Sequence, residues 1–279
     1  MVKIGVIGGH GNLGNLIVKT LEQDGFDVIV SDFETEITNI VLAKTADVII
    51  VSVPINKTSD IIEEIKPYLS QKQLIMDVTS VKSEPVNQML KTSADVIGLH
   101  PMFGSHISSL KGQTIVMVKG RDNNNWFDKV QNYFKDKELK VKETTAKHHD
   151  KMMALIQVLV HFNTISLGHT MASLGYDVKE TLEFTSPIYK MELSMVGRIF
   201  AQDPDLYGSI PLNNPHTKDV LKKHKENSEK LMQIINGKNL DEFVDWFNDT
   251  AEYFDNFKIE ALQESKKVIE ELVNLYEKA

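Results

Sequence analysis

Residues 3–15 read KIGVIGGHGNLGN, and the expected organisation of the first half of the chain follows from this stretch. The apolar run at residues 4–7 is typical of a buried β-strand, and the apolar residues after the glycines recur at helical intervals. Between them, Gly9, Gly11 and Gly14 form the pattern G-x-G-x-x-G, which binds dinucleotides when it joins a strand to a helix. The stretch therefore predicts a strand, a phosphate-binding turn and a helix.

Each glycine of this pattern has its own expected role. Gly9 permits the tight turn, Gly11 lets a pyrophosphate approach the backbone, and Gly14 allows the helix to pack closely on the strand. The N–H groups at the start of the helix, with Asn12 and Leu13, offer hydrogen bonds and the positive end of the helix dipole to the phosphates. A purely structural turn in an unrelated α/β domain is the alternative explanation.

An acidic residue stands where the ribose of a dinucleotide would bind. A second strand is expected at residues 27–31, and it ends at Asp32, eighteen positions after Gly14. Asp32 is followed by Phe33 and Glu34 rather than by a basic residue, so a 2′-phosphate would meet negative charge. We therefore expect the cofactor to be NAD rather than NADP.

Apolar runs continue to alternate with helical patterns through the strand expected at 96–99, which predicts a Rossmann-type, parallel, doubly wound sheet. Ligands bind outside the carboxyl ends of the strands in such sheets. We therefore expect Val53–Pro54, Thr79–Ser80 and His100–Pro101 to line one crevice, with Val53 and Pro54 on the cofactor side. Further strands are expected at 46–53, 74–78, 96–99, 114–118 and 139–141.

The pattern becomes entirely helical beyond residue 145. We expect an NAD-binding domain at residues 1–145 and an all-helical domain for substrate binding and dimerisation at residues 146–279. The helical part is rich in Met and Phe and carries more apolar surface than one small domain needs, which favours a homodimer. Long helical patterns are found at 146–174, 186–202, 216–236 and 240–276.

Composition limits the other classes of function. Of the 279 residues, 42% are hydrophobic and 25% charged, as in soluble globular proteins of about two domains. The net charge of −8 argues against nucleic acid or an anionic membrane as the main partner. The chain has no cysteine, which excludes thiolate chemistry and suits a reducing cytoplasm. No signal segment, membrane-spanning run or metal-ligand motif stands out, so we expect a cytoplasmic protein without a metal.

Three further segments make the chain resemble the prephenate dehydrogenases, and in particular the dehydrogenase part of the bifunctional bacterial T-proteins. The segments are GLHPMFG at 98–104, HDKMMALIQVLVHF at 149–162 and SPIYKMELSMVGRIFAQD at 186–203. The resemblance runs essentially from end to end, without room for the chorismate mutase region that precedes the dehydrogenase in T-proteins. Ser105 and His106 depart from the Pro-Asp of those proteins, beside the expected active-site loop.

The resemblance implies that prephenate is oxidised by NAD⁺ and loses its ring carboxylate as CO₂, giving 4-hydroxyphenylpyruvate and NADH in tyrosine biosynthesis. It implies His100 as the residue that accepts the hydroxyl proton, since a neutral imidazole can do so near neutral pH. It also places Ser80 near the nicotinamide. The structural alternatives are packing for His100 and capping of the following helix for Ser80.

The resemblance assigns the substrate's other groups to the helical domain. Arg198 matches an arginine that binds the ring carboxylate, for which the guanidinium fork is suited, although an ion pair within its own domain is the alternative. Lys190 stands where the relatives have arginine, which keeps the charge but not the fork. His161 matches a histidine that contacts the substrate's side chain, or else is a satisfied core residue. His149 matches another family histidine, with a structural or cofactor-side role.

Three other functions remain open at this point. Arogenate dehydrogenase would run the same chemistry on a substrate with an ammonium in place of the side-chain keto group. Another β-hydroxyacid or imine reductase with a helical C-terminal domain would share the glycine loop but not the 186–203 segment. A non-catalytic NAD-binding sensor would not need both His100 and Arg198.

Overall fold

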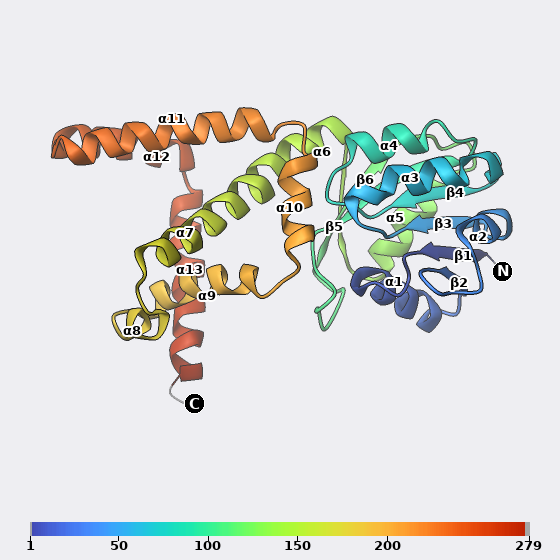
Figure 1. Ribbon diagram of the computed structural model, residues 1–279, viewed down its shortest axis with the longest axis horizontal. Helices are drawn as coiled ribbons and strands as arrows, with labels where there is room; N and C mark the ends of the chain where they lie inside the picture. Colours follow the sequence, from blue (N-terminus) through green and yellow to red (C-terminus); the bar gives the residue numbers. More distant parts are fainter. Residues whose placement is uncertain (1, 277–279) are drawn as a thin grey trace. The chain divides into compact units, whose positions relative to one another are not determined.

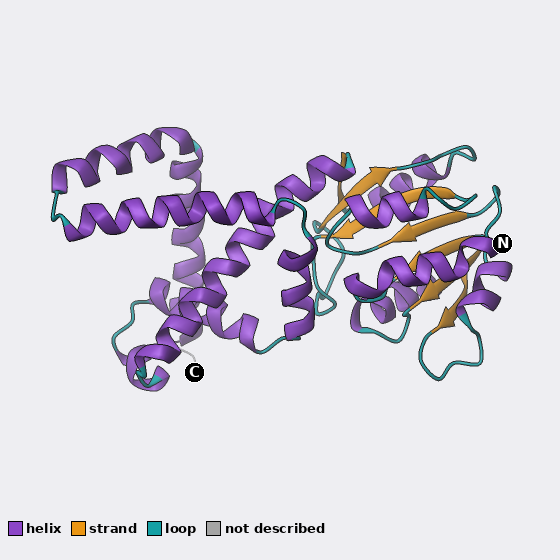
Figure 2. Cartoon of the chain, turned by 45° about the horizontal axis from the view of Figure 1, so that its top comes forward, coloured by secondary structure: helices purple, strands orange, loops and turns teal. Residues whose placement is uncertain are grey.

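The computed structural model describes residues 2–276, and it divides into two compact units (Figures 1 and 2). The first unit comprises Met1–Val158 with Asp205–Thr217, and the second comprises Leu159–Pro204 with Lys218–Ala279. All strands of the described residues belong to the first unit, whereas the described elements of the second unit are helices. The expected combination of an α/β unit and an all-helical unit is confirmed.

Seven strands form one sheet in the order β2-β1-β3-β4-β5-β6-β7. The first five strands along the chain are mutually parallel, with Ile4 of β1 opposite Val28 of β2 and Val48 of β3. This order brings the carboxyl ends of β1, β3, β4 and β5 to one edge of the sheet. The strands are β1 Lys3–Ile7, β2 Asp27–Ser31, β3 Val48–Val51, β4 Leu74–Asp77, β5 Asp95–Pro101, β6 Thr114–Lys119 and β7 Lys140–Thr144.

The pairing of β5 with β6 differs from the parallel pairing of the five strands before it. β6 runs antiparallel to β5, with Leu99 opposite Met117 and His100 opposite Val116. No helix forms between these strands, and a parallel pairing needs a crossover that is usually helical. β6 and β7 are again parallel and are joined through a helix. Strands buried on both faces read as continuous apolar runs, so their hydrophobicity did not reveal the change of direction.

Helices cover both faces of the sheet (Figure 1). Successive residues of a strand point to opposite faces, so Ile50 of β3 packs with α1 and α5, whereas Ile49 and Val51 pack with α2, α3 and α4. A 3₁₀ turn, Lys66–Tyr68, follows α3 and contains Pro67. These helices are α1 Asn12–Gln23, α2 Asn39–Thr45, α3 Ile55–Ile65, α4 Ser83–Met89 and α5 Trp126–Asp136.

The first unit extends past residue 145, where the sequence places the domain boundary. Helix α6, Ala146–Met153, and the π-helical segment Ala154–Leu159 follow β7 and pack on the first unit up to Val158. Helix α10, Pro204–Asn213, lies mainly in the first unit as well. Buried side chains of α6, including His149 and Met153, hold this segment there.

The second unit is built mainly from helices that the periodicity predicted, with two corrections. The short helix α8 lies outside the predicted ranges. The pattern at 240–276 forms two helices rather than one, and they are separated near Asp255, whose φ is 42°. The helices are α7 Val160–Leu174, α8 Val178–Glu183, α9 Pro187–Phe200, α11 Thr217–Asn236, α12 Leu240–Phe254 and α13 Phe257–Tyr276.

One helical stretch of the described chain, Ala146–Leu174, is long and apolar enough to cross a membrane by length and composition alone. This differs from the expectation that no such run exists. The core helix of a soluble protein passes the same test, and the stretch begins with the buried polar residues His149 and Asp150.

Candidate active site

The turn between β1 and α1 contains both Gly8 and Gly9. Gly8 has a φ of 81°, and a Cβ placed on it would lie 2.3 Å from the carbonyl oxygen of Ser52 and 3.0 Å from Val53. Gly9 has no positive φ, and its absent side chain instead makes room for Val30. Gly9 lies in the same turn, but the positive φ falls on Gly8, which the sequence did not distinguish because adjacent glycines look alike. The same contacts bring Val53 beside the loop.

The start of α1 has the geometry that phosphate binding requires. A Cβ on Gly14 would lie 2.0 Å from the carbonyl oxygen of Gly8, so only glycine lets the helix begin this close to the loop. A Cβ on Gly11 would meet only that same oxygen, at 3.4 Å, which leaves open space beside Gly11. No side chain caps α1, so the first N–H groups of Asn12 and Leu13 face outward from an uncapped end. These residues fit a dinucleotide pyrophosphate.

Asp32 lies beside this loop, as the sequence predicts. Its Oδ2 accepts a hydrogen bond of 2.7 Å from the backbone N–H of His10, and its Oδ1 accepts one of 2.7 Å from that of Phe33. The carboxylate is half-exposed, and its oxygens have further lone pairs for ribose hydroxyls. Pro54, at the start of α3, lies at the same edge of the sheet, after β3.

His100 is a buried residue of β5, one position before the strand ends. Its Nδ1 lies 2.8 Å from Nε2 of His149, and Nδ1 of His149 lies 2.9 Å from Oδ1 of Asp150. The two rings meet edge to face, with centroids 5.0 Å apart. The side chains thus form a continuous series of imidazole, imidazole and carboxylate, which we call the His100–His149–Asp150 chain.

Asp150 is held in its charged form at the end of this chain. Burial raises its pKa, but hydrogen bonds from His149 and from Ser83 and Lys82 outweigh burial, so the pKa of Asp150 lies below its ordinary range. The backbone N–H of Lys82 donates to Oδ1 at 2.7 Å, and that of Ser83 donates to Oδ2 at 2.8 Å. Asp150 therefore caps α4 from a distant part of the chain. The amide of Asn214 also donates to the carbonyl oxygen of Asp150, at 2.8 Å.

The charged carboxylate determines which nitrogen of His100 is free to accept a proton. Asp150 only accepts, so Nδ1 of a neutral His149 carries the hydrogen and Nε2 of His149 has a lone pair. Nδ1 of His100 then donates to that lone pair, which leaves Nε2 of His100 as an acceptor. Burial first, and then the neighbouring His149 ring and the Lys82 ammonium, lower the pKa of His100 well below its ordinary value. His100 is therefore a neutral base at neutral pH.

Gln157 faces the accepting nitrogen of His100. Its Nε2 lies 3.4 Å from Nε2 of His100, and its Oε1 is buried without a hydrogen-bond partner among the described residues. Gln157 belongs to the π-helical segment, and such segments are frequent at functional sites. No pattern in the sequence marks this residue, since one Gln on an apolar helix belongs to no motif.

A fully buried ion pair fixes the ends of the two strands beside this group. Nζ of Lys82 donates to Oδ2 of Asp77, at the end of β4, and to the carbonyl oxygen of Leu99, at 2.7 Å. Burial lowers the pKa of Lys82 despite the opposing charge of Asp77. No motif in the sequence pairs Lys82 with Asp77. The one hint of the ion pair in the sequence was that Lys82 follows Asp77, at the end of a strand, by five positions.

Ser80 lies at the same edge, between β4 and α4, and is half-buried. The structure does not support helix capping as its role, because α4 begins at Ser83 and its first N–H groups donate to Asp150. His149, which the sequence analysis left out of the catalytic group, is in direct contact with His100. The pairing could not be inferred from the sequence because forty-nine positions separate the two histidines.

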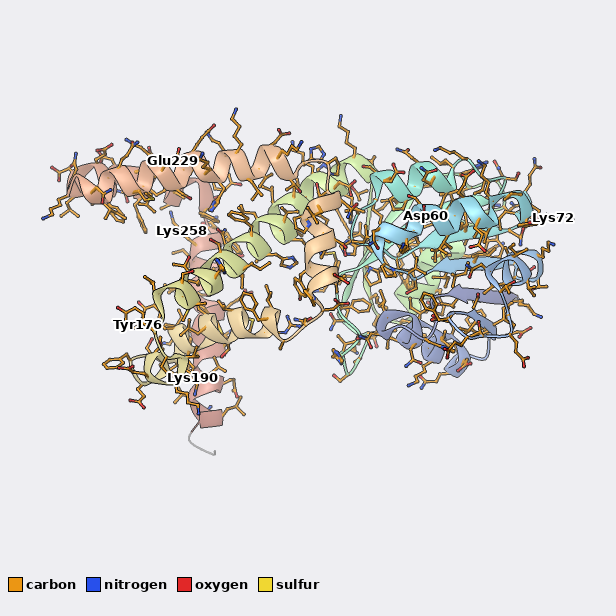
Figure 3. All side chains as sticks on the ribbon, in the orientation of Figure 1. Asp60, Lys72, Tyr176, Lys190, Glu229 and Lys258 are labelled. Atoms are coloured by element: carbon orange, nitrogen blue, oxygen red, sulfur yellow. The ribbon has the colours of Figure 1, made fainter. Side chains whose placement is uncertain are left out.

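The three other predicted substrate residues belong to the second unit. His161 lies on α7, and Lys190 and Arg198 lie on α9, near whose start Figure 3 labels Lys190. These helices pack closely, since a Cβ on Gly168 of α7 would lie 2.3 Å from the ring of Phe200. Arg198 is exposed, and burial lowers the pKa of His161.

No group of three metal-binding side chains occurs among residues 2–276.

Known proteins resemble the chain over both units. Residues 25–143 match the family model described as prephenate dehydrogenase, nucleotide-binding domain, and residues 145–249 match prephenate dehydrogenase, dimerization domain. The T-protein of Haemophilus influenzae is 34% identical over 277 residues, which cover 98% of this chain and 72% of that protein. A probable arogenate/prephenate dehydrogenase of Methanocaldococcus jannaschii is 36% identical over 270 residues, covering 90% of this chain and 60% of that protein. The chain thus spans only part of the length of these relatives.

Solved structures share the fold. Prephenate dehydrogenase from A. aeolicus, determined with hydroxyphenyl propionate and NAD⁺, superposes with a TM-score of 0.73 at 17% identity and covers 94% of this chain and 98% of that one. Synechocystis arogenate dehydrogenase gives a TM-score of 0.70 at 19% identity, covering 92% and 100%. Because two family models match most of the chain and a relative is 34% identical over nearly all of it, this chain belongs to the prephenate dehydrogenase family.

Proposed function

We propose that the chain is an NAD-dependent prephenate dehydrogenase of tyrosine biosynthesis, which oxidises and decarboxylates prephenate to 4-hydroxyphenylpyruvate. The His100–His149–Asp150 chain is the observation that carries the proposal, because it presents a neutral, accepting Nε2 at the sheet edge where ligands bind. Membership of the family, with its nucleotide-binding domain, supports the reaction class.

His100 takes the proton of the substrate's ring hydroxyl in this proposal. As the hydroxyl oxygen gains carbonyl character, its proton passes to Nε2 of His100, and the resulting imidazolium keeps its hydrogen bond to His149. The carboxylate of Asp150, one imidazole away, stabilises that positive charge. His149 and Asp150 act as positioning residues, since His149 touches His100 and Asp150 holds His149.

The first unit fits NAD⁺ by three features of its own residues. The space beside Gly11 and the uncapped start of α1 suit the pyrophosphate, and Asp32 suits the ribose hydroxyls. Val53, Pro54 and Ser80 are proposed to complete the cofactor and nicotinamide side. When bound, NAD⁺ supplies the acceptor for the hydride that leaves the ring carbon.

The substrate's carboxylates need cations, which we propose the second unit supplies. Arg198 is proposed to bind the ring carboxylate that leaves as CO₂, and Lys190 and His161 to contact the side chain. Loss of CO₂ makes the ring aromatic, which drives the reaction forward. Arogenate is the alternative substrate, and the name of the Methanocaldococcus jannaschii relative covers both compounds.

We also propose that the chain is a cytoplasmic homodimer that associates through its second unit. Large apolar side chains are exposed on or beside its helices, among them Phe184 at 84%, Tyr189 at 61% and Phe247 at 59%. The family model that matches residues 145–249 describes a dimerization domain. Light scattering on the purified chain is expected to give about twice the 31.6 kDa of one chain, and a monomer at micromolar concentration would contradict the proposal.

The proposed function is tested by NADH formation with prephenate and arogenate, each with NAD⁺ and NADP⁺. Fast turnover of prephenate with NAD⁺ is expected. Turnover of arogenate alone would keep the mechanism and change the substrate. No turnover with any pair, by folded protein that binds NAD⁺, would reject the enzyme and favour the sensor.

Replacing Arg198 by Ala is expected to raise the KM for prephenate by about tenfold or more, because one carboxylate loses its cation. Lys at the same position is expected to recover part of the affinity, since it restores charge but not the fork. Steady-state kinetics at saturating NAD⁺ measure both variants, and an unchanged KM in the Ala variant would assign Arg198 a structural role.

Replacing Asp32 by Ala is expected to weaken the binding of NAD⁺ by roughly tenfold and to reduce the preference for NAD⁺ over NADP⁺, because the ribose loses a charged hydrogen-bond acceptor. Glu36→Ala, an exposed residue of the same loop, is the matched control. Cofactor titrations of both variants decide the matter. A preference that Asp32→Ala leaves untouched would remove Asp32 from the cofactor site.

The acid limb of kcat/KM is expected to lie below pH 6.5, because the pKa of the base His100 is well below that value. The free energy of unfolding depends on the same group. The pKa of His100 is about 6.5 in the unfolded chain and lower in the folded chain. Between these two values the unfolded chain binds the proton and the folded chain does not, so stability is lost as pH falls below about 6.5. Activity and melting temperature measured from pH 4 to 8 test this, and an acid limb above pH 7 would be inconsistent with His100 as the base.

A further inference from the structure

One continuous helical stretch holds both ring nitrogens of His100. Nε2 of His149, on α6, lies 2.8 Å from Nδ1 of His100, and the amide nitrogen of Gln157, in the segment Ala154–Leu159, lies 3.4 Å from Nε2 of His100. All three side chains belong to the first unit. The contact with His149 fixes which nitrogen of His100 is the base, and Gln157 meets that nitrogen itself.

The π-helical form of the segment explains how two residues eight positions apart reach the same ring. In a regular α-helix each residue turns the chain by about 100°, so Gln157 would point about 80° away from His149. The π-helical turn is wider, with hydrogen bonds between residues five positions apart, and it turns less at each residue. The wider turn therefore brings Gln157 back toward the face of the helix that carries His149.

The amide of Gln157 is only partly satisfied. Its Nε2 donates to His100 over 3.4 Å, which is long for a hydrogen bond and indicates a weak contact that is easily exchanged. Its Oε1 is buried and has no hydrogen-bond partner among residues 2–276. Buried side-chain oxygens are almost always paired, so an unpaired one beside a base calls for a physical reason.

We infer that Gln157 is a positioning residue for the proposed base and that it serves His100 in both protonation states of the imidazole. While His100 is neutral, the N–H of Gln157 donates to the lone pair of Nε2. Once Nε2 carries the hydroxyl proton it becomes a donor, and a half-turn of the amide brings Oε1 of Gln157 to the same place as an acceptor. This role rests on the proposed function, in which His100 receives that proton.

The titratable groups that face His100 act on the ring from other positions. His149 and Asp150 of α6 are linked to its Nδ1, and the ammonium of Lys82, which precedes α4, is paired with Asp77 of β4. Among the described residues, the hydrogen-bond partner of Nε2 is a neutral amide. An amide can donate or accept at this nitrogen without adding a charge to the site.

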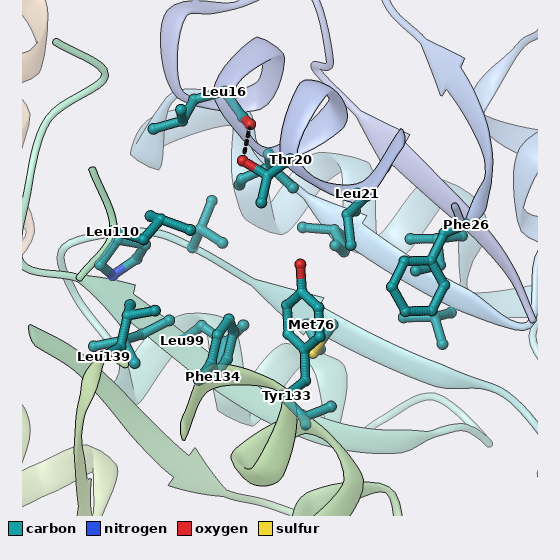
Figure 4. Close-up of a pocket in the computed structure, with 18 of the residues that line it drawn as sticks. Leu16, Thr20, Leu21, Phe26, Met76, Leu99, Leu110, Tyr133, Phe134 and Leu139 are labelled. Atoms are coloured by element: carbon teal, nitrogen blue, oxygen red, sulfur yellow. Dashed lines mark hydrogen bonds between the residues drawn. The ribbon is translucent and has the colours of Figure 1, made fainter. Parts of the chain in front are cut away.

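The face of the sheet behind His100 offers its ring no polar partner among the described residues. An apolar cavity of about 260 Å³ lies there, between α1 and α5 (Figure 4). Leu99 and Pro101 line this cavity, and because side chains alternate along a strand, His100 points to the opposite face. A partner for Nε2 therefore comes from the helical stretch that carries Gln157.

The substitution Gln157→Glu tests the contact with His100. Glu has the same size but its carboxylate only accepts, so Nε2 of His100 is expected to hold a proton in this variant. The pKa of His100 is expected to rise by about one pH unit or more, because a negative charge replaces an amide N–H beside the ring. NMR titration of the full chain with nitrogen-15 histidine measures this pKa without substrate, on the signal that His100→Asn removes.

Gln88→Glu is the matched control for this titration, since Gln88 is a half-buried residue of the same unit whose amide donates to Glu84. It is expected to leave the pKa of His100 unchanged. An unchanged pKa in Gln157→Glu would overturn the inference.

The substitution Gln157→Leu separates the proposed role from packing, because Leu is close in size to Gln and cannot form hydrogen bonds. We expect kcat for prephenate to fall by about ten- to hundredfold, the effect of one hydrogen bond to a charged group, at an unchanged KM for NAD⁺. Raising the pH is expected to restore part of the activity of Gln157→Glu, since His100 becomes neutral again, but none of that of Gln157→Leu.

Gln88→Leu is the control for kcat and is expected to match the unaltered chain. A kcat of Gln157→Leu equal to that of the unaltered chain would overturn the inference, and if Gln157→Leu does not fold, the pKa and the pH profile of Gln157→Glu decide. If the unaltered chain turned over neither prephenate nor arogenate, the proposed function would fail, and the NMR titration alone would decide whether Gln157 serves the ring of His100.

Discussion

Turnover of prephenate is expected to fall by about two to four orders of magnitude when His100 is replaced by Asn, the range typical of losing a general base. Asn is close in size and retains hydrogen-bonding groups, but it cannot take up the proton of the hydroxyl at neutral pH. The binding of NAD⁺ is expected to stay the same, because the glycine loop and Asp32 do not touch His100. Single-turnover NADH formation and a separate NAD⁺ titration measure the two effects.

His148→Asn is the matched control for this change. His148 precedes His149 on α6 but is exposed, and its side chain makes no contact with His100. The control is expected to retain the activity of the unaltered protein. Near-normal turnover in His100→Asn would remove His100 from the mechanism, and the base would then have to be sought among other groups at the strand ends.

Replacing Asp150 by Asn is expected to have the second-largest effect, and it acts on both activity and stability. The amide has one acceptor oxygen where the carboxylate serves His149, Lys82 and Ser83, so buried donors lose a partner. Breaking a buried charged interaction of this kind typically lowers the free energy of unfolding by about 3–5 kcal/mol. Urea unfolding at pH 7 measures this loss.

The effect of Asp150→Asn on turnover has a separate physical cause. Without the carboxylate, His149 can take the tautomer that carries its hydrogen on Nε2, and Nδ1 of His100 then has to accept. The hydrogen of His100 moves to Nε2, the nitrogen that has to act as the base, and the same change beside a catalytic histidine in serine proteases lowers kcat by about 10⁴. We expect kcat to fall by about two orders of magnitude or more.

A kcat that falls while the KM for NAD⁺ stays constant would separate this tautomer effect from general loosening of the fold. Asp136→Asn, an exposed carboxylate at the end of α5, is the control and is expected to change neither stability nor kcat. If Asp150→Asn unfolded at the same urea concentration as the unaltered chain and kept its kcat, the carboxylate would have neither role.

Local sequence patterns were sufficient for most of the elements and for the place of Asp32 beside the glycine loop. The glycine spacing at 9–14 and the apolar run before it predicted a strand, a turn and a helix, and the structure has all three. Asp32 could be placed beside the loop because the length of one helix and one strand fixes where the second strand ends. The sequence did not reveal that Gly8 rather than Gly9 takes the positive φ, since that depends on Ser52, far along the chain.

The sequence by itself determined the alternation of strands and helices, the dinucleotide-binding pattern and membership of the family, because these depend on periodicity and on contiguous motifs. Only the tertiary structure decided the direction of β6 and the way His100, His149 and Asp150 meet. Asp150 reaches across sixty-eight positions to the start of α4, and such contacts leave no local periodicity. The tautomer of His100 and the lowering of its pKa follow from burial and from these neighbours, so they exist only once the chain has folded.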